Sequence, residues 1–411
     1  MSTSEKPHHL RASDLRALSL LATQATHAVT AMSEGVHQSV LSTLGSPSGD
    51  SEAQTRGLTG LIYQSIHGVT RLVGQGVAAA LTRLEPWLLR LEGSPDESFE
   101  RAAVMAALNG VMGDRLLASG NPLATPMSLR FQGQVLTAAA MPVASQVTGK
   151  VLLVMHGLCM NDLQWTAQSA GTPVNHASAL AQALGYTPVY VRYNSGRHVS
   201  ENGAELAQQL EAVLRHWPVP VQDISVLAHS MGGLVMRSAV YCATQAGMPW
   251  LSQLKHIVFL GTPHHGAPLE RAGNWVDVIL GSTPYSRPFT KLGQLRSSGV
   301  TDLRYGLVLD SDWQGHDRFR RQPDRRTPLP LPAGVACFSV AATLAGKRSA
   351  IADRLLGDGL VPLHSALGQH DEARRCLNFP ADHQHIAYRT GHLQLLSDPA
   401  ITRLLLSWLG A

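Results

Sequence analysis

The stretch Ala228-His229-Ser230-Met231-Gly232-Gly233 follows the apolar run of residues 224–227 and indicates how the chain folds around it. A buried strand that ends at a serine and passes at once into a helix forces that serine into a strained backbone conformation with an exposed hydroxyl. Strand and helix then meet closely at the small residues Ala228 and Gly232. The pattern predicts a serine nucleophile at Ser230. The alternative is a serine whose hydroxyl caps a helix.

A serine that attacks a carbonyl carbon needs two backbone N–H groups to meet the negative charge that forms on oxygen. Met231, directly after the serine, is expected to supply one of them. The predicted strand over residues 151–155 runs into His156-Gly157-Leu158, where Gly157 lets the loop turn its amides toward the serine. We therefore expect Leu158 to be the second donor, although a plain strand-to-loop glycine is the alternative.

The serine also needs a base, the base needs an orienting acid, and the three follow one another as Ser, Asp or Glu, His in sheets of this kind. Asp358 stands between two glycines in a predicted tight turn after the strand expected at 335–341. It is preferred to Asp353, which lies in a stretch typical of a solvated helical turn. His392 follows a short predicted strand and precedes the last helix, which is where the base belongs.

Other histidines are assigned different positions. His383 and His385 precede the short strand at 386–388 and are predicted to lie at the surface. His229 can hydrogen-bond within the serine turn, and His264 follows a strand end near the site. No histidine or cysteine has the spacing of a metal site, and the four cysteines form no Cys-x-x-Cys pair, so neither a metal site nor a disulfide framework is expected.

The chain has 411 residues and 44% hydrophobic content, enough for a large core and two or three structural units. Apolar residues recur at helical spacing over 15–44 and 58–84, and a third helix is predicted to run to about residue 117. Residues 1–125 are therefore predicted to form an N-terminal helical region. We expect these helices to pack on one another or on the rest of the chain, with binding to a membrane surface or a dimer contact as alternatives.

Residues 126–411 are predicted to form an α/β domain. Short apolar strands alternate with helices there, which favours a mostly parallel sheet covered on both faces. Over residues 267–332 the periodicity weakens and Pro, Gly, Ser and Arg accumulate. An insertion of this length over a strand end is expected to be a lid or cap.

Composition excludes several classes of function. A net charge of +4 is a weak excess, and no nucleic-acid motif accompanies it, so no nucleic-acid partner is expected. The arginines between 318 and 326 are taken as a solvated loop, with a lipid headgroup contact as the alternative. We find no stretch of about 18 apolar residues and no apolar core of a secretory signal at the start. A cytoplasmic location is expected, with peripheral membrane association left open.

Five segments in this order resemble the lipase branch of the α/β-hydrolases. They are His156-Gly157-Leu158, Ala228-His229-Ser230-Met231-Gly232-Gly233, Gly261-Thr262-Pro263-His264-His265-Gly266, Gly357-Asp358-Gly359-Leu360-Val361-Pro362 and Gly391-His392-Leu393. The likeness extends from about residue 129 to the C-terminus. It is closest to bacterial proteins similar to glycosylphosphatidylinositol inositol-deacylases. Ala228 departs from the commoner glycine of the serine turn.

This resemblance implies an α/β-hydrolase fold and a Ser-His-Asp esterase without a cofactor. Ser230 would attack, His392 would carry the proton and Asp358 would hold the imidazole. The expected substrate is a lipid-like or other acyl ester. A thioesterase, amidase or polyester depolymerase on the same triad stays open, as does a non-enzymatic protein that binds a membrane or a partner. The oligomeric state is unknown.

Overall fold

The computed structural model describes most of the chain beyond residue 97. The described residues are 98–169, 171–267, 296–320, 323–346 and 357–410, with the single positions 20, 22, 23 and 64. The helices predicted over 15–44 and 58–84, part of the predicted lid, and Asp353 therefore lie outside the described residues.

The chain divides into two compact units. One comprises Met1–Arg101 and Leu116–Leu123, and the other comprises Ala102–Arg115 and Ala124–Ala411. In the first, Ser98 accepts a hydrogen bond from the N–H of Arg101 (3.2 Å). The boundary at residue 125 stays a prediction. None of the helices that the structure describes is both long and apolar enough to cross a membrane.

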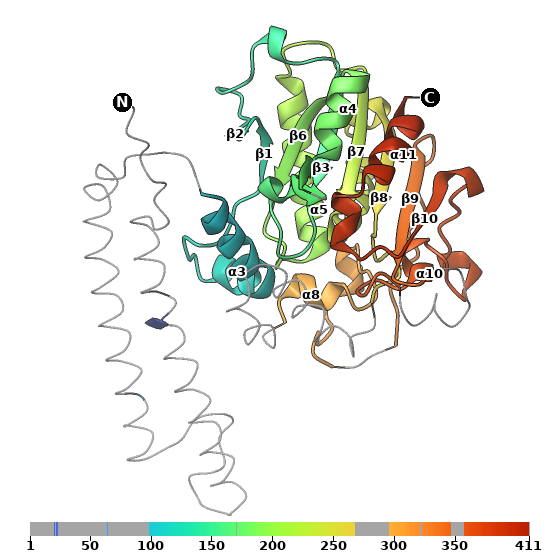
Figure 1. The fold of residues 1–411 in the computed structure, drawn as a ribbon. Helices are drawn as coiled ribbons and strands as arrows, with labels where there is room; N and C mark the ends of the chain where they lie inside the picture. Colours follow the sequence, from blue (N-terminus) through green and yellow to red (C-terminus); the bar gives the residue numbers. More distant parts are fainter. Residues whose placement is uncertain are drawn as a thin grey trace, which may run out of the picture. The chain divides into compact units, whose positions relative to one another are not determined.

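An eight-stranded sheet forms the centre of the second unit, in the order β10-β9-β8-β7-β3-β6-β1-β2 (Figure 1). Its strands are β1 (Ser128–Phe131), β2 (Gln134–Val135), β3 (Lys150–Met155), β6 (Thr187–Arg192), β7 (Asp223–His229), β8 (Leu254–Leu260), β9 (Ala336–Thr343) and β10 (Gln384–Tyr388). Neighbours from β6 through β10 are parallel. Only β1 and β2 run antiparallel to their neighbours. The predicted mostly parallel sheet is confirmed.

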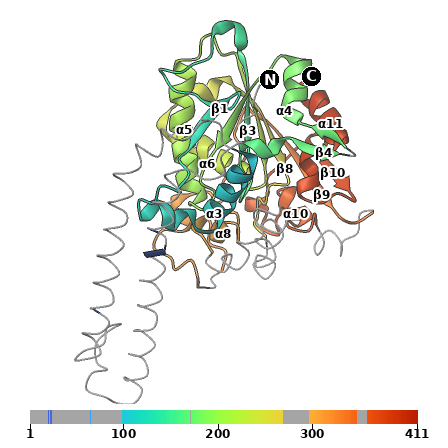
Figure 2. The ribbon, with the colours of Figure 1, turned by 60° about the vertical axis from the view of Figure 1, so that its left-hand side comes forward.

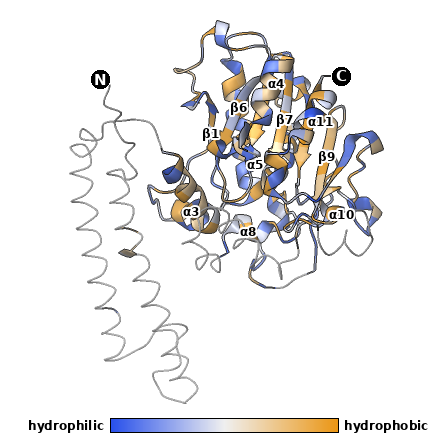
Figure 3. Ribbon diagram, viewed as in Figure 1, coloured by the Kyte–Doolittle hydropathy of each residue, from blue (hydrophilic) through white to orange (hydrophobic). Residues whose placement is uncertain are grey.

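The alternation of side chains explains why apolar runs form these strands. In β3, Val151, Leu153 and Met155 join one hydrophobic cluster, whereas Leu152 and Val154 join another. Successive residues of a strand point to opposite faces, so a strand covered on both faces must be apolar throughout. Figure 3 shows this concentration of apolar residues in the central strands.

Helices cover both faces of the sheet (Figure 2). The first cluster includes residues of α3 (Phe99–Ala118), α5 (Val199–Arg215) and α6 (Met231–Ala246). The second includes residues of α4 (His176–Leu184) and α11 (Pro399–Leu409). Two short helices, α8 (Ser298–Asp302) and α10 (Leu363–Ala366), follow β8 and β9 respectively. A separate hairpin of β4 (Ala167–Ser169) and β5 (Thr172–Val174) was not predicted.

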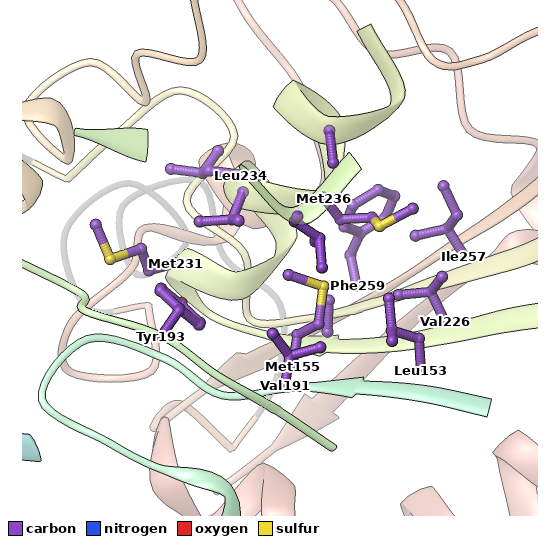
Figure 4. Packing of buried hydrophobic residues seen from close by; sticks show 14 of the residues in the cluster. Leu153, Met155, Val191, Tyr193, Val226, Met231, Leu234, Met236, Ile257 and Phe259 are labelled. Carbon is purple, nitrogen blue, oxygen red and sulfur yellow. The ribbon is translucent and has the colours of Figure 1, made fainter. Parts of the chain in front are cut away.

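The helix after the serine is fixed to the sheet by its apolar side. Leu234 and Met236 of α6 lie over β-strand residues that include Met155, Val226 and Phe259 (Figure 4). All five side chains are fully buried. Because α6 begins directly after Ser230, this packing also fixes the turn that carries the serine.

The last helix should be a sensitive point of stability. Leu405 of α11 is fully buried, so Leu405→Ala is expected to lower the free energy of unfolding by about 2–5 kcal/mol. Leu406→Ala, on the same helix at a half-buried position, is the matched control and should cost less. Urea unfolding of the two variants measures the difference. Equal losses would contradict the assignment of Leu405 to the core.

Candidate active site

The turn between β7 and α6 has the strained conformation predicted from its sequence. Ser230 has φ 55° and ψ −124°, in a region that a residue with a side chain rarely occupies. Its N–H donates to the carbonyl of Leu260 on the neighbouring strand (2.8 Å). A Cβ on Gly232 would lie 2.6 Å from the carbonyl oxygen of His156, so the close approach requires glycine there. Ala228, on the strand side of the turn, is fully buried.

A buried carboxylate in the loop after β9 forms a hydrogen bond with an imidazole in the loop after β10. Nδ1 of His392 donates to Oδ2 of Asp358 at 2.6 Å, and the two residues are only 4% and 3% exposed. The other carboxylate oxygen accepts from the N–H groups of Leu360 (2.9 Å) and Val361 (2.7 Å). These bonds fix the carboxylate, and the carboxylate fixes the imidazole through Nδ1, which leaves Nε2 as the second ring nitrogen.

Gly261 connects the serine turn to the imidazole. It follows Leu260, which bonds to Ser230, and a Cβ on Gly261 would lie 3.1 Å from both Nδ1 and Cε1 of His392. The ring of His229 completes the connection, since it lies 4.7 Å from the ring of His392, centre to centre. Three segments distant in sequence therefore meet at the carboxyl edge of the sheet.

The loop after β3 lies against the serine. A Cβ on Gly157 would be 3.0 Å from the Cβ of Ser230. Leu158 is 1% exposed and belongs to the same hydrophobic cluster as Met231, the first residue of α6. The N–H of Met231 is one of the amides at a helix start that have no partner within the helix. The two predicted oxyanion donors thus lie on segments that adjoin the serine.

His156 is a fixed, neutral residue that supports this loop. Its Nδ1 donates to the carbonyl of Gly157 (2.8 Å), and its Nε2 accepts from the N–H of Tyr193 (3.3 Å). The Tyr193 ring stacks on it at 4.2 Å, and the Tyr193 hydroxyl donates to the His156 carbonyl (2.8 Å). Burial lowers the pKa of His156 from 6.5 to about 4. His156 belongs to one of the predicted site segments, whereas Tyr193 belongs to no motif and could not be predicted from the sequence.

His229 lies between the nucleophile turn and the imidazole loop. Its Nε2 is 3.3 Å from the carbonyl oxygen of His392. Burial, followed by the neighbouring His392, lowers the pKa of His229 well below 6.5. It is therefore neutral near pH 7, with Nε2 carrying the proton that it donates to the carbonyl. The expected hydrogen bond within the turn is thus made to the loop of His392 instead.

His264 is fully buried but belongs to a different neighbourhood. Its ring lies edge-on to Phe259 at 4.8 Å, and burial lowers its pKa well below 6.5. Its carbonyl accepts from the guanidinium of Arg326 (2.8 Å), which also bonds to Nδ1 of His265 (2.8 Å). Arg326 is therefore buried and partnered, so the interpretation of residues 318–326 as a solvated loop is wrong for this arginine. Arg318 likewise pairs with Asp114 (2.7 Å).

The described part of the predicted lid contacts the edge of this site. A Cβ on Gly299 in α8 would lie 2.8 Å from the terminal methyl of Met231. Asp302 of the same helix accepts from Nδ1 of His198 (3.0 Å) and from the N–H of Val199 (2.8 Å), at the start of α5. Trp313 stacks on His198 at 3.7 Å. That these residues act as a lid stays a prediction.

The two histidines assigned to the surface are half-buried. His385 lies within β10 rather than before it. His383 stacks on Phe338 at 4.1 Å, and its Nδ1 donates to the carbonyl of Cys337 (3.1 Å). The contacts of His383 come from β9, more than 40 residues earlier, which a local pattern does not indicate. All four cysteines are free, and of these Cys159 and Cys337 are buried.

The sheet and its connections define the α/β-hydrolase fold. A mostly parallel sheet carries a strained serine turn after β7, a carboxylate turn after β9 and a histidine after β10. This agrees with the predicted fold class.

One family model and several solved structures are similar to this chain. The family model described as a domain of unknown function, DUF7379, matches residues 119–303. No curated protein matches the chain. Three similar structures are a Bacillus licheniformis lipase (19% identity, 65% of this chain and 95% of that one, TM-score 0.41), an α/β hydrolase superfamily protein from Enterococcus faecalis (14%, 65% and 92%, 0.36) and a Pyrobaculum calidifontis esterase (12%, 79% and 94%, 0.34).

Burial of neutral His156 should appear as a pH dependence of stability. Its pKa is about 4 when folded and 6.5 when unfolded, so the unfolded chain binds more protons between these values. Its stabilising contribution is complete above pH 6.5 and is lost as the pH falls toward 4. Between pH 7 and pH 5 the wild type should lose about 2 kcal/mol more than His156→Gln. Urea unfolding at both pH values tests this, and parallel losses would contradict it.

Proposed function

We propose that the chain is a serine hydrolase that cleaves carboxylic esters through Ser230, His392 and Asp358. The observation that carries this proposal is the buried 2.6 Å hydrogen bond between His392 and Asp358, at the same sheet edge as a serine held at φ 55°. A buried acid-imidazole pair beside a strained serine is the arrangement that activates a hydroxyl as a nucleophile.

In the proposed first step, Oγ of Ser230 attacks the ester carbonyl carbon while Nε2 of His392 takes the hydroxyl proton. The N–H groups of Met231 and Leu158 meet the charge on the carbonyl oxygen. Asp358 keeps its proton acceptor role and stabilises the imidazolium without itself becoming protonated. The imidazolium then gives its proton to the departing alcohol, leaving an acyl group on the serine.

In the second step, a water molecule replaces the alcohol. Its proton goes to Nε2 of His392, its oxygen attacks the acyl carbon, and the serine leaves with the proton from the imidazolium. The carboxylic acid is released and the three residues return to their initial states. No step needs a metal or an organic cofactor.

Replacement of the nucleophile tests the proposal directly. A fluorophosphonate probe should label the full chain. Ser230→Ala should abolish this labelling and should lower kcat for ester hydrolysis roughly a millionfold. Ser238→Ala is a matched control, because Ser238 is also buried but lies further along α6. It should keep the labelling. Undiminished ester hydrolysis by the Ser230 variant would exclude this serine as nucleophile.

Acyl-chain preference tests the assignment to lipid-like esters. Each methylene that enters an apolar pocket contributes about 0.8 kcal/mol, so an acyl chain two carbons longer is expected to raise kcat/KM roughly fifteenfold. A series of p-nitrophenyl esters of increasing acyl length measures this. A kcat/KM that does not change with acyl length would indicate an enzyme for small esters and would contradict the assignment to lipid-like esters.

A thioesterase, an amidase or a polyester depolymerase would use the same three residues. Rates on acyl thioesters, anilides and polyester films separate these activities from ester cleavage. The likeness to glycosylphosphatidylinositol inositol-deacylases rests on the five sequence motifs alone and stays a prediction. A non-enzymatic binding protein is the remaining alternative, and an unlabelled, inactive wild-type chain would favour it.

A further inference from the structure

A helix that precedes the sheet in sequence touches the loop that carries Leu158. A Cβ on Gly110 of α3 would lie 2.2 Å from Sγ of Cys159, and 2.9 Å from both its Cα and its backbone N. Sγ of Cys159 is also 3.9 Å from the carbonyl oxygen of Ala107, one turn earlier in α3. Helix and loop backbones are therefore in direct contact, without a side chain from the helix between them.

The loop needs such support because its backbone is strained at the contact. Cys159 has φ 58°, a left-handed conformation that a residue with a side chain keeps only when its surroundings enforce it. From the other side, the N–H of Cys159 donates to the hydroxyl oxygen of Ser195 (3.0 Å). Leu158 precedes Cys159 directly, so a shift of Cys159 also moves the Leu158 amide.

The helix is itself fixed at the same position. The carbonyl of Gly110 accepts a hydrogen bond from the hydroxyl of Ser297 (2.6 Å). Beyond the kink of α3 at Met112, Asp114 accepts from the N–H and the hydroxyl of Ser298 (both 3.0 Å) and pairs with Arg318. Residues 297–318 therefore hold α3 where it contacts the loop, and the helix cannot retreat from an enlarged Gly110 without breaking these bonds.

We propose that Gly110 is a positioning residue for the oxyanion hole. By contact with Cys159, α3 sets the distance between the Leu158 N–H and the carbonyl oxygen of the substrate. This proposal rests on the proposed ester hydrolysis. It assigns a role in catalytic geometry to α3, a helix that precedes the first strand of the sheet and connects no two of its strands.

Gly110→Ala in the full chain tests the proposal. The added methyl group must displace loop backbone, so the Leu158 amide should leave its position. Loss of one oxyanion donor lowers kcat by about 10²–10³-fold, and partial displacement should lower it at least about tenfold. KM should stay constant, and the inhibition constant of an alkyl trifluoromethyl ketone, which forms a tetrahedral adduct, should rise in parallel with the loss of kcat.

Gly113→Ala is the matched control three residues later, just beyond the kink that interrupts α3 at Met112. There the nearest atoms belong to the Asn194 side-chain amide, at 1.9 to 2.8 Å from the added Cβ, rather than to the oxyanion loop. Asn194 precedes Ser195, which holds the Cys159 N–H, so this variant should lower stability and should lower kcat and raise the inhibition constant by less than Gly110→Ala does. Adding Cys159→Gly to Gly110→Ala removes the Sγ and suits the positive φ, so it should restore part of kcat.

The outcomes are distinct. If the wild type hydrolyses esters and folded Gly110→Ala has unchanged kcat and inhibition constant, the positioning role is wrong and the proposed function stands. If the wild type neither turns over esters nor reacts with a fluorophosphonate, both proposals fail. If Gly110→Ala does not fold, Cys159→Ala replaces it. That variant removes the sulfur contact with α3 and should lower kcat at constant KM, and an unchanged kcat would overturn the positioning role.

Discussion

The parallel direction of the central strands is the constraint on which the rest of the structure depends. Because β3, β7, β8, β9 and β10 run in the same direction, the loops that follow them emerge at one edge. That edge brings His229, the residue before Ser230, against the ring of His392. The hydrogen bond from the Ser230 N–H to Leu260 and the packing of His392 on Gly261 are its direct results.

The environment of the site keeps its accessory histidines neutral. Burial lowers the pKa of both His156 and His229, so each ring acts through one donated and fixed hydrogen bond rather than through charge. A second positive charge beside His392 would oppose the imidazolium that the proposed mechanism forms there. The neutral neighbours thus suit a site in which one imidazole gains and loses the proton.

The sequence was informative where local patterns determine structure. The strand after Val335 and the turn around Asp358 were found because a strand covered on both faces must be apolar and because glycines permit a tight turn. The contact of Gly110 with Cys159 could not be found, since neither residue belongs to a motif and 48 positions separate them. The same holds for Arg326, whose partners come from the segment after β8, and for His383, which Phe338 covers.

A crystal structure of the full chain after reaction with a fluorophosphonate tests the central claim most directly. The account predicts phosphorus bonded to Oγ of Ser230, with its oxygen within hydrogen-bond distance of the Leu158 and Met231 amides and with Nε2 of His392 beside Oγ. Phosphorus on another residue, or an imidazole of His392 turned away from the adduct, would contradict the account.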